Sequence, residues 1–95
     1  MNTSLQHAVL FQALAQPMRL QLLEILSLGP VCVCDLVRLT GKRQPYISQQ
    51  LIALRHADLV TAERQGRNIL YRLNYRRLEE LEQIISALLQ QVHNT

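Results

Sequence analysis

The sequence predicts a mainly α-helical domain that carries one small β-hairpin. Apolar residues recur with helical spacing over residues 4–57, two short alternating segments then flank Gly66, and the last part of the chain carries one apolar stripe. The 95 residues suffice for a single domain, expected to span residues 1–95. Its core is small enough that a second subunit would add to its stability.

Four helices are expected in the first part of the chain. The first runs from Ser4 to Ala15. The second runs from Pro17 to Leu28, because proline is tolerated in a first turn and Gly29-Pro30 ends the pattern. A short third helix follows, from Val31 or Cys34 to Leu39, and a fourth runs from Gln44 to Ala57.

The third and fourth helices are joined by a tight turn at residues 40–42, which makes them a helix-turn-helix. Strands are then expected over Leu59–Arg64 and Ile69–Leu73, where apolar and polar residues alternate. Gly66 suits the positive φ of the turn between them. A hairpin in this place is a wing, so the expected fold class is a winged helix-turn-helix.

The last helix carries a single apolar stripe close to a heptad seam, opposite a face of Glu, Gln and Arg. A second copy of the chain is the simplest partner for this stripe, and we therefore expect a homodimer. The residues expected at its interface, on the first and last helices, are Leu5, Val9, Leu78, Leu81, Ile85 and Leu88.

Positive charge is concentrated in the middle of a chain whose net charge is +3, whereas Glu79, Glu80 and Glu82 lie near its end. A localised basic face suits contact with nucleic-acid phosphates. No segment approaches the ~18 apolar residues of a membrane span, and no leader pattern precedes the first helix. We expect a cytoplasmic protein with no membrane partner.

The fourth helix is the expected reader of double-stranded DNA. Glutamine bonds adenine bidentately, serine bonds several base edges, and the N-terminal end of a recognition helix meets the major groove. Flanking basic side chains hold phosphates, and arginine at a wing tip reaches the minor groove. The residues expected to contact DNA are Lys42, Arg43, Gln44, Tyr46, Ser48, Gln49, Arg55, Arg64 and Arg67.

The chain has two cysteines, Cys32 and Cys34, at the start of the third helix. Two thiolates one residue apart can converge on one thiophilic centre, although buried cysteine is also a common small hydrophobe. In a regular helix these positions lie about 200° apart, so ligand binding is expected to bend the helix start. A disulfide would close a tiny strained loop, so reduced thiols are expected. Asp35 lies beside the helix start and is expected to cap it, with a role as a ligand as the alternative.

Three segments resemble the ArsR/SmtB family of winged-helix repressors over essentially the whole chain. They are residues 13–20 (ALAQPMRL), residues 44–51 (QPYISQQL), and residues 65–67 (QGR) followed by residues 71–73 (YRL). The resemblance implies a homodimer that binds an operator and is released from it by an effector. Within the family, residues 31–36 (VCVCDL) look like the arsenic-responsive branch, whose thiol site lies at this place.

The sequence departs from the family pattern at two places. Val37 stands where the arsenic-sensing pattern often has a third cysteine, so this segment offers no three-thiolate site. Asn74, Tyr75 and Arg76 stand near the start of the last helix, where other members have an Asp and His pair, so an intersubunit zinc site is not expected. Two thiolates suit structural zinc poorly, because it usually takes four protein ligands, so no structural metal is expected either. Trivalent arsenic or antimony, or an organoarsenical, suits two thiolates and is the expected effector.

Other functions stay open at this point. A repressor that responds to thiol oxidation or to persulfide would use the same two cysteines. A Cys-x-Cys dithiol oxidoreductase is less favoured, because the strand-helix-strand setting of such motifs is missing. A dimeric module whose helix-turn-helix binds protein would lack the salt dependence that phosphate contacts produce.

Overall fold

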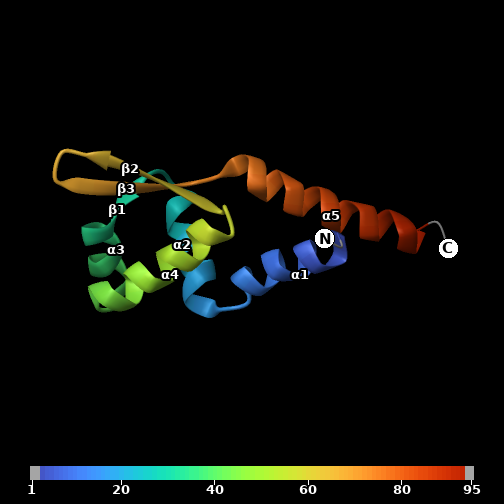
Figure 1. Ribbon diagram of the computed structural model, residues 1–95, viewed down its shortest axis with the longest axis horizontal. Helices are drawn as coiled ribbons and strands as arrows, with labels where there is room; N and C mark the ends of the chain where they lie inside the picture. Colours follow the sequence, from blue (N-terminus) through green and yellow to red (C-terminus); the bar gives the residue numbers. More distant parts are fainter. Residues whose placement is uncertain (1–2, 94–95) are drawn as a thin grey trace.

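The computed structural model of the protein describes residues 3–93, so residues 1, 2, 94 and 95 of the expected domain lie outside the described residues. Five helices and three strands follow one another along this part of the chain (Figure 1). They are α1 (Thr3–Leu14), α2 (Pro17–Leu26), β1 (Val31–Cys32), α3 (Val33–Thr40), α4 (Gln44–His56), β2 (Val60–Gln65), β3 (Asn68–Leu73) and α5 (Tyr75–His93). The winged helix-turn-helix predicted from the sequence is confirmed, with element ends within about two residues of those expected.

The strand β1 is an element that the sequence analysis missed. Val31 and Cys32 pair antiparallel with Tyr71 and Leu70 of β3, so the sheet has three strands in the order β1-β3-β2. A strand of two residues is too short to show the alternation of apolar and polar side chains that indicates a strand. The sequence pattern therefore predicts the start of a helix there. The chain reaches this position through Gly29, whose φ of +142° is open to glycine and unfavourable for other residues.

The core is aliphatic, as the composition predicts, and it gathers around α4. Its largest fully buried side chains are Leu22, Leu26, Leu36, Ile47, Leu51, Leu54 and Leu59. Three of them, at spacings of four and three along α4, form the inner face of that helix. The opposite face of α4 is left to solvent.

The C-terminal ends of α3 and α4 are each fixed by a residue with positive φ. Gly41 ends α3 in the left-handed region at φ +70°, and its N–H donates to the carbonyl of Val37 at 3.0 Å. Asp58, at φ +62°, turns the chain after α4, and its carbonyl accepts a hydrogen bond from Asn74 Nδ2 at 2.8 Å. Arg77 Nε donates to the carbonyl of Ala57 at 3.1 Å, which fixes the start of α5 on the end of α4.

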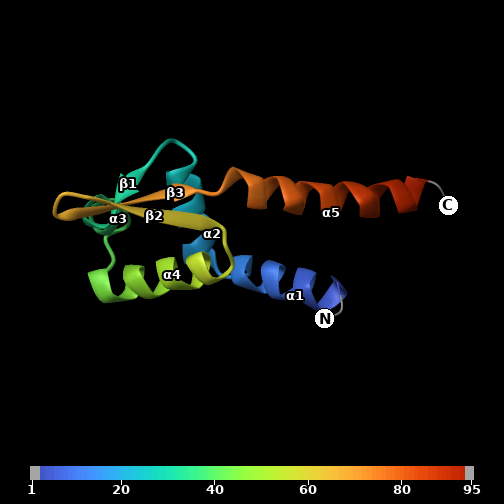
Figure 2. The same cartoon turned by 45° about the horizontal axis from the view of Figure 1, so that its top comes forward.

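The molecule is elongated, with extents of 52 × 25 × 20 Å. The tip of the β2–β3 hairpin and the N-terminal end of α4 lie toward one end of the long axis, whereas α1 and α5 extend toward the other (Figures 1 and 2). No helix within residues 3–93 is both long and apolar enough to cross a membrane.

The burial of α4 generates a stability prediction with an internal control. Leu51 is 0% exposed, so Leu51→Ala is expected to lower the free energy of unfolding by about 2–5 kcal/mol. The neighbouring residue Ile52 is 50% exposed, and Ile52→Ala is expected to cost less than about 1 kcal/mol. Urea denaturation at one protein concentration measures both, and equal losses would contradict the described core.

Candidate DNA interface and cysteine site

The N-terminal half of α4 presents a polar face to solvent. Gln44, Tyr46 and Gln49 are exposed and Ser48 is half-buried, whereas Ile47 between them is buried. This alternation follows from the helical period, which turns neighbouring positions to different sides. The predicted base-reading residues therefore share an accessible surface at the start of the helix.

The basic residues predicted to contact DNA fall into three places, which are the residues before α4, the C-terminal part of α4 and the tip of the hairpin. Lys42 and Arg43 are exposed immediately before α4, and Arg43 occupies its N-cap position without a side-chain capping bond. Arg55 is also exposed, but it lies eleven residues after Gln44, about 16 Å along the helix axis. It does not cluster with the residues at the N-terminal end.

The hairpin carries Arg64 and Arg67 at its exposed tip. Arg64 Nε donates to the carbonyl of Gly66 at 3.3 Å, so this side chain folds back over the turn. Behind the tip, an ion pair of 3.1 Å joins Arg72 on β3 to Glu63 on β2. Within residues 3–93, no side-chain hydrogen bond or ion pair holds Arg67, so it is the freer of the two wing arginines to meet a phosphate or a groove.

A buried polar contact on the inner side of α4 escaped the sequence analysis. Gln50 is 7% exposed, and its Oε1 accepts a hydrogen bond from Arg19 Nε of α2 at 3.0 Å. Arg19 Nη1 also donates to the carbonyl of Ala13 in α1 at 3.2 Å. One guanidinium on α2 thus links α4 to α1 and α2. The pairing spans 31 residues, so no local pattern indicates it.

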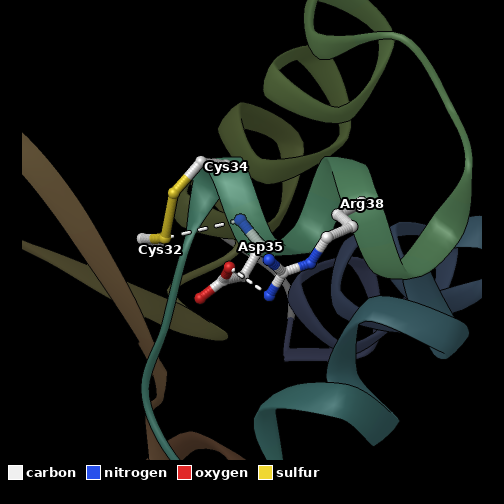
Figure 3. Close-up of polar contacts among 4 residues, drawn as sticks. All are labelled: Cys32, Cys34, Asp35 and Arg38. Atoms are coloured by element: carbon white, nitrogen blue, oxygen red, sulfur yellow. Dashed lines mark hydrogen bonds and ion pairs between the residues drawn. A yellow bond between two sulfur atoms is a disulfide. The ribbon is translucent and has the colours of Figure 1, made fainter.

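The two cysteines lie where β1 meets α3 (Figure 3). Cys32 is the last residue of β1 and the N-cap of α3, with extended backbone at φ −79° and ψ 158°. Its sulfur is the capping group, because it accepts a hydrogen bond from the Asp35 N–H at 3.4 Å. Cys32 is buried, whereas Cys34, in the first turn of α3, is exposed.

The arrangement of the sulfurs differs from the expectation in two respects. The chain joins Cys32 and Cys34 in a disulfide, with 5.4 Å between their Cα atoms, instead of holding two separate thiols. The expected opposition of about 200° applies to two helical residues. It is wrong here because Cys32 precedes the helix, so its side chain turns to the side of Cys34 without any bend in α3.

Asp35 also has a different role from the one expected. Its N–H bonds the sulfur of Cys32, while its carboxylate accepts from Arg38 Nη2 at 2.7 Å on the same helix (Figure 3). A carboxylate oxygen of Asp35 and the two sulfurs all lie within 4.8 Å of one another. Among the described residues, this is the group of three whose side chains are placed to hold a metal ion.

The residues predicted for dimerisation divide into exposed and covered ones. Leu5, Val9, Ile85 and Leu88 expose about half or more of their surface. Leu78 is half-buried against the core, and Leu81 is only 7% exposed because its own chain covers it. A cleft of about 730 Å³ separates α1 from α5 on this side.

A helix-turn-helix with an exposed polar recognition face, followed by a basic hairpin, defines a winged helix-turn-helix DNA-binding protein. Residues 16–62 match the model of the family described as "Bacterial regulatory protein, arsR family". The chain belongs to the ArsR family of transcriptional regulators, as the resemblance predicted. This membership also confirms that it is a regulator and not an enzyme, which removes the dithiol oxidoreductase.

Three relatives illustrate the similarity. The "Arsenical resistance operon repressor" of Staphylococcus xylosus is 33% identical over 76 residues, which are 80% of this chain and 73% of that protein. The "HTH-type transcriptional regulator NmtR" of Mycobacterium tuberculosis is 46% identical over 72% of this chain, which spans only 57% of that protein. A homodimeric winged helix-turn-helix DNA-binding domain from Mycobacterium bovis, solved in solution, aligns with a TM-score of 0.72 and 34% identity, covering 86% of this chain and 79% of that one.

The difference in burial between the cysteines predicts an order of thiol reactivity. After reduction, N-ethylmaleimide is expected to modify Cys34 well before Cys32, because Cys34 is exposed and Cys32 is only 9% exposed. Without reductant, neither is expected to react, since both sulfurs are in the disulfide. Peptide mass spectrometry over a time course measures both rates, and faster modification of Cys32 would contradict the described site.

Proposed function

We propose that the chain is a homodimeric repressor that binds operator DNA and is released when a thiophilic ligand occupies Cys32 and Cys34. The observation that carries the proposal is the convergence of the two sulfurs at the junction of β1 and α3. Trivalent arsenic or antimony, or an organoarsenical, is the proposed ligand class, because two thiolates satisfy it and the staphylococcal relative is named for arsenical resistance.

The position of this site connects it to both elements proposed to contact DNA. Cys32 lies opposite Leu70 in the β1–β3 ladder, so its backbone is paired with the wing hairpin. Cys34 belongs to α3, whose residue Leu36 is fully buried in the core that holds α4. A displacement at the cysteines therefore acts on the wing through β1 and on the recognition helix through α3.

The proposed release step is a change in how α3 begins. A ligand that takes the lone pair of Cys32 Sγ competes with the Asp35 N–H, which that sulfur caps. The start of α3 then shifts relative to β1, and the two recognition helices of a dimer no longer match half-sites one DNA turn apart. A coupling of about 1–3 kcal/mol is enough to weaken operator binding about 5- to 150-fold.

The second candidate is a repressor of the same fold that responds to thiol oxidation. The disulfide between Cys32 and Cys34 favours it, because oxidation of two thiols to this bond is a complete two-electron step that releases two protons to the oxidant. The two candidates differ in what releases DNA: a trivalent metalloid added to reduced protein, or an oxidant or persulfide donor alone.

The decisive measurement is fluorescence anisotropy of the reduced protein on DNA from its own promoter. Arsenite, antimonite or a monosubstituted trivalent arsenical is expected to release the DNA. Cys32→Ser and Cys34→Ser are expected to keep operator binding and to lose this release, since serine supplies no thiolate. Release only by oxidant or persulfide would favour the redox candidate, and no release by any of them would contradict both.

The wing assignment has its own test in the salt dependence of DNA affinity. Arg67→Ala is expected to reduce the slope of log K against log [salt] by about 0.9, the contribution of one neutralised phosphate. Arg76→Ala removes an exposed arginine of α5, outside the proposed interface, and is expected to leave the slope unchanged. Unchanged slopes in both variants would remove Arg67 from the interface.

A further inference from the structure

A single side chain connects the helix proposed to read DNA with a helix proposed to join two subunits. Arg19 of α2 donates from Nε to Oε1 of Gln50 in α4 at 3.0 Å, and from Nη1 to the carbonyl of Ala13 in α1 at 3.2 Å. We propose that Arg19 is a positioning residue, which sets the place of α4 relative to α1 and thereby lets the dimer distinguish its operator from other DNA. The inference rests on the proposed DNA binding and dimerisation, but not on the ligand of the cysteine site.

Gln50 is the acceptor on α4, and its surroundings leave this contact to orient the helix. Gln50 is 7% exposed, and it is the one polar or charged residue that is buried within residues 4–91. The apolar side chains beside it are held by hydrophobic burial, which is non-directional. A hydrogen bond weakens with both distance and angle, so the bond from Arg19 adds a restraint that burial does not supply. Gln50 lies six residues after Gln44, about 9 Å along the axis from the N-terminal end of α4.

The second acceptor lies in the last turn of α1. The final carbonyls of a helix have no partner within that helix. Residue 17, four positions after Ala13, is a proline and has no N–H to donate to the Ala13 carbonyl. Arg19 supplies this missing donor, and its positive charge suits the negative end of the helix dipole. The same guanidinium therefore caps α1 and holds Gln50 of α4.

Side-chain packing leaves a gap between α1 and α4 beside this contact. A hollow of about 310 Å³ lies there, and its lining includes Ala13, Ala53, Ala57 and Arg19. The C-terminal ends of α1 and α4 lie close together in Figure 2. The methyl groups of alanine are too short to interlock across this hollow, so the guanidinium is the group that spans it. Its rigid fork of donors holds two acceptors in one geometry, which the flexible point charge of lysine does not do.

A displaced α4 affects the two kinds of DNA contact unequally. Hydrogen bonds to base edges require matched donors and acceptors, whereas phosphate contacts carry no sequence information. In a dimer, the two recognition helices must also match half-sites one DNA turn apart. Loss of the Arg19 contacts is therefore expected to lower affinity for the operator more than affinity for unrelated DNA. The ratio of the two affinities is the quantity that reports positioning.

The experiment measures this ratio by fluorescence anisotropy on DNA from the protein's own promoter and on unrelated DNA of equal length, at one salt concentration with reductant present. Urea denaturation of the same variants measures folding. Arg19→Met leaves the Gln50 amide buried without its partner and is expected to lower both the urea midpoint and the ratio. Arg19→Met combined with Gln50→Leu makes both partners apolar, so most of the urea midpoint is expected to return. The ratio is expected to stay at least about tenfold below that of the unaltered chain, a loss of the size of one bidentate base contact.

Two control variants separate positioning from the loss of a charge. Gln50→Glu keeps an acceptor for Arg19 Nε and is expected to hold the ratio within about threefold of the unaltered chain. Arg76→Met removes an exposed arginine of α5 and is expected to leave the ratio unchanged.

The double variant decides the inference. Recovery of the ratio together with the urea midpoint would overturn it, because Arg19 would then act on stability alone. An equal loss of affinity for both DNAs would overturn it as well, since the guanidinium would then contribute only charge. Equal binding of both DNAs by the unaltered chain is a different result, which would remove the proposed operator binding and the inference with it.

Discussion

The burial of one face of α4 is the constraint on which the rest of the structure depends. Ile47, Leu51 and Leu54 are all fully buried, so the rotation of the helix about its axis is fixed by its own apolar spacing. This rotation turns Gln44, Tyr46 and Gln49 toward solvent. Gln50 adds orientation to this packing, because burial of its amide is compensated by the hydrogen bond from Arg19. The same helix thus gives one face to the core and presents the other to the proposed DNA interface.

The cysteine site includes a residue with several structural roles. Cys32 ends a strand, begins a helix and supplies the atom that caps it. Any chemistry at its sulfur therefore acts on backbone hydrogen bonding directly and needs no chain of intermediate side chains. Arg77 and Asn74 donate hydrogen bonds to the carbonyls of Ala57 and Asp58, just after α4. Leu81 of α5 also belongs to the core that contains the buried face of α4, so the helix proposed to join two subunits is linked to α4.

How much could be predicted from the sequence follows from the range of each interaction. Helices α1 to α5 and the hairpin repeat a local period over many residues, and their prediction is confirmed. β1 has two residues and owes its existence to the edge of β3, far along the chain. Whether the two sulfurs lie on the same side depends on whether α3 begins before or after Cys32. Sequence periodicity does not resolve a difference of one residue in where a helix begins. Leu81 belongs to the apolar stripe of α5, but it is buried by the rest of its own chain. The spacing of the stripe does not show which of its residues make such tertiary contacts.

The short length of β1 has a consequence for how the molecule behaves in concentrated solution. β1 covers β3 only at Leu70 and Tyr71, so the distal part of the hairpin has open backbone edges on both strands. Such edges invite strand addition between copies, and natural sheets discourage it with short strands and charged side chains. Arg64 and Arg67 lie at this part of the hairpin, where mutual repulsion between copies opposes edge-to-edge aggregation. Two positive charges at the hairpin tip therefore disfavour edge-to-edge pairing between copies of the free protein.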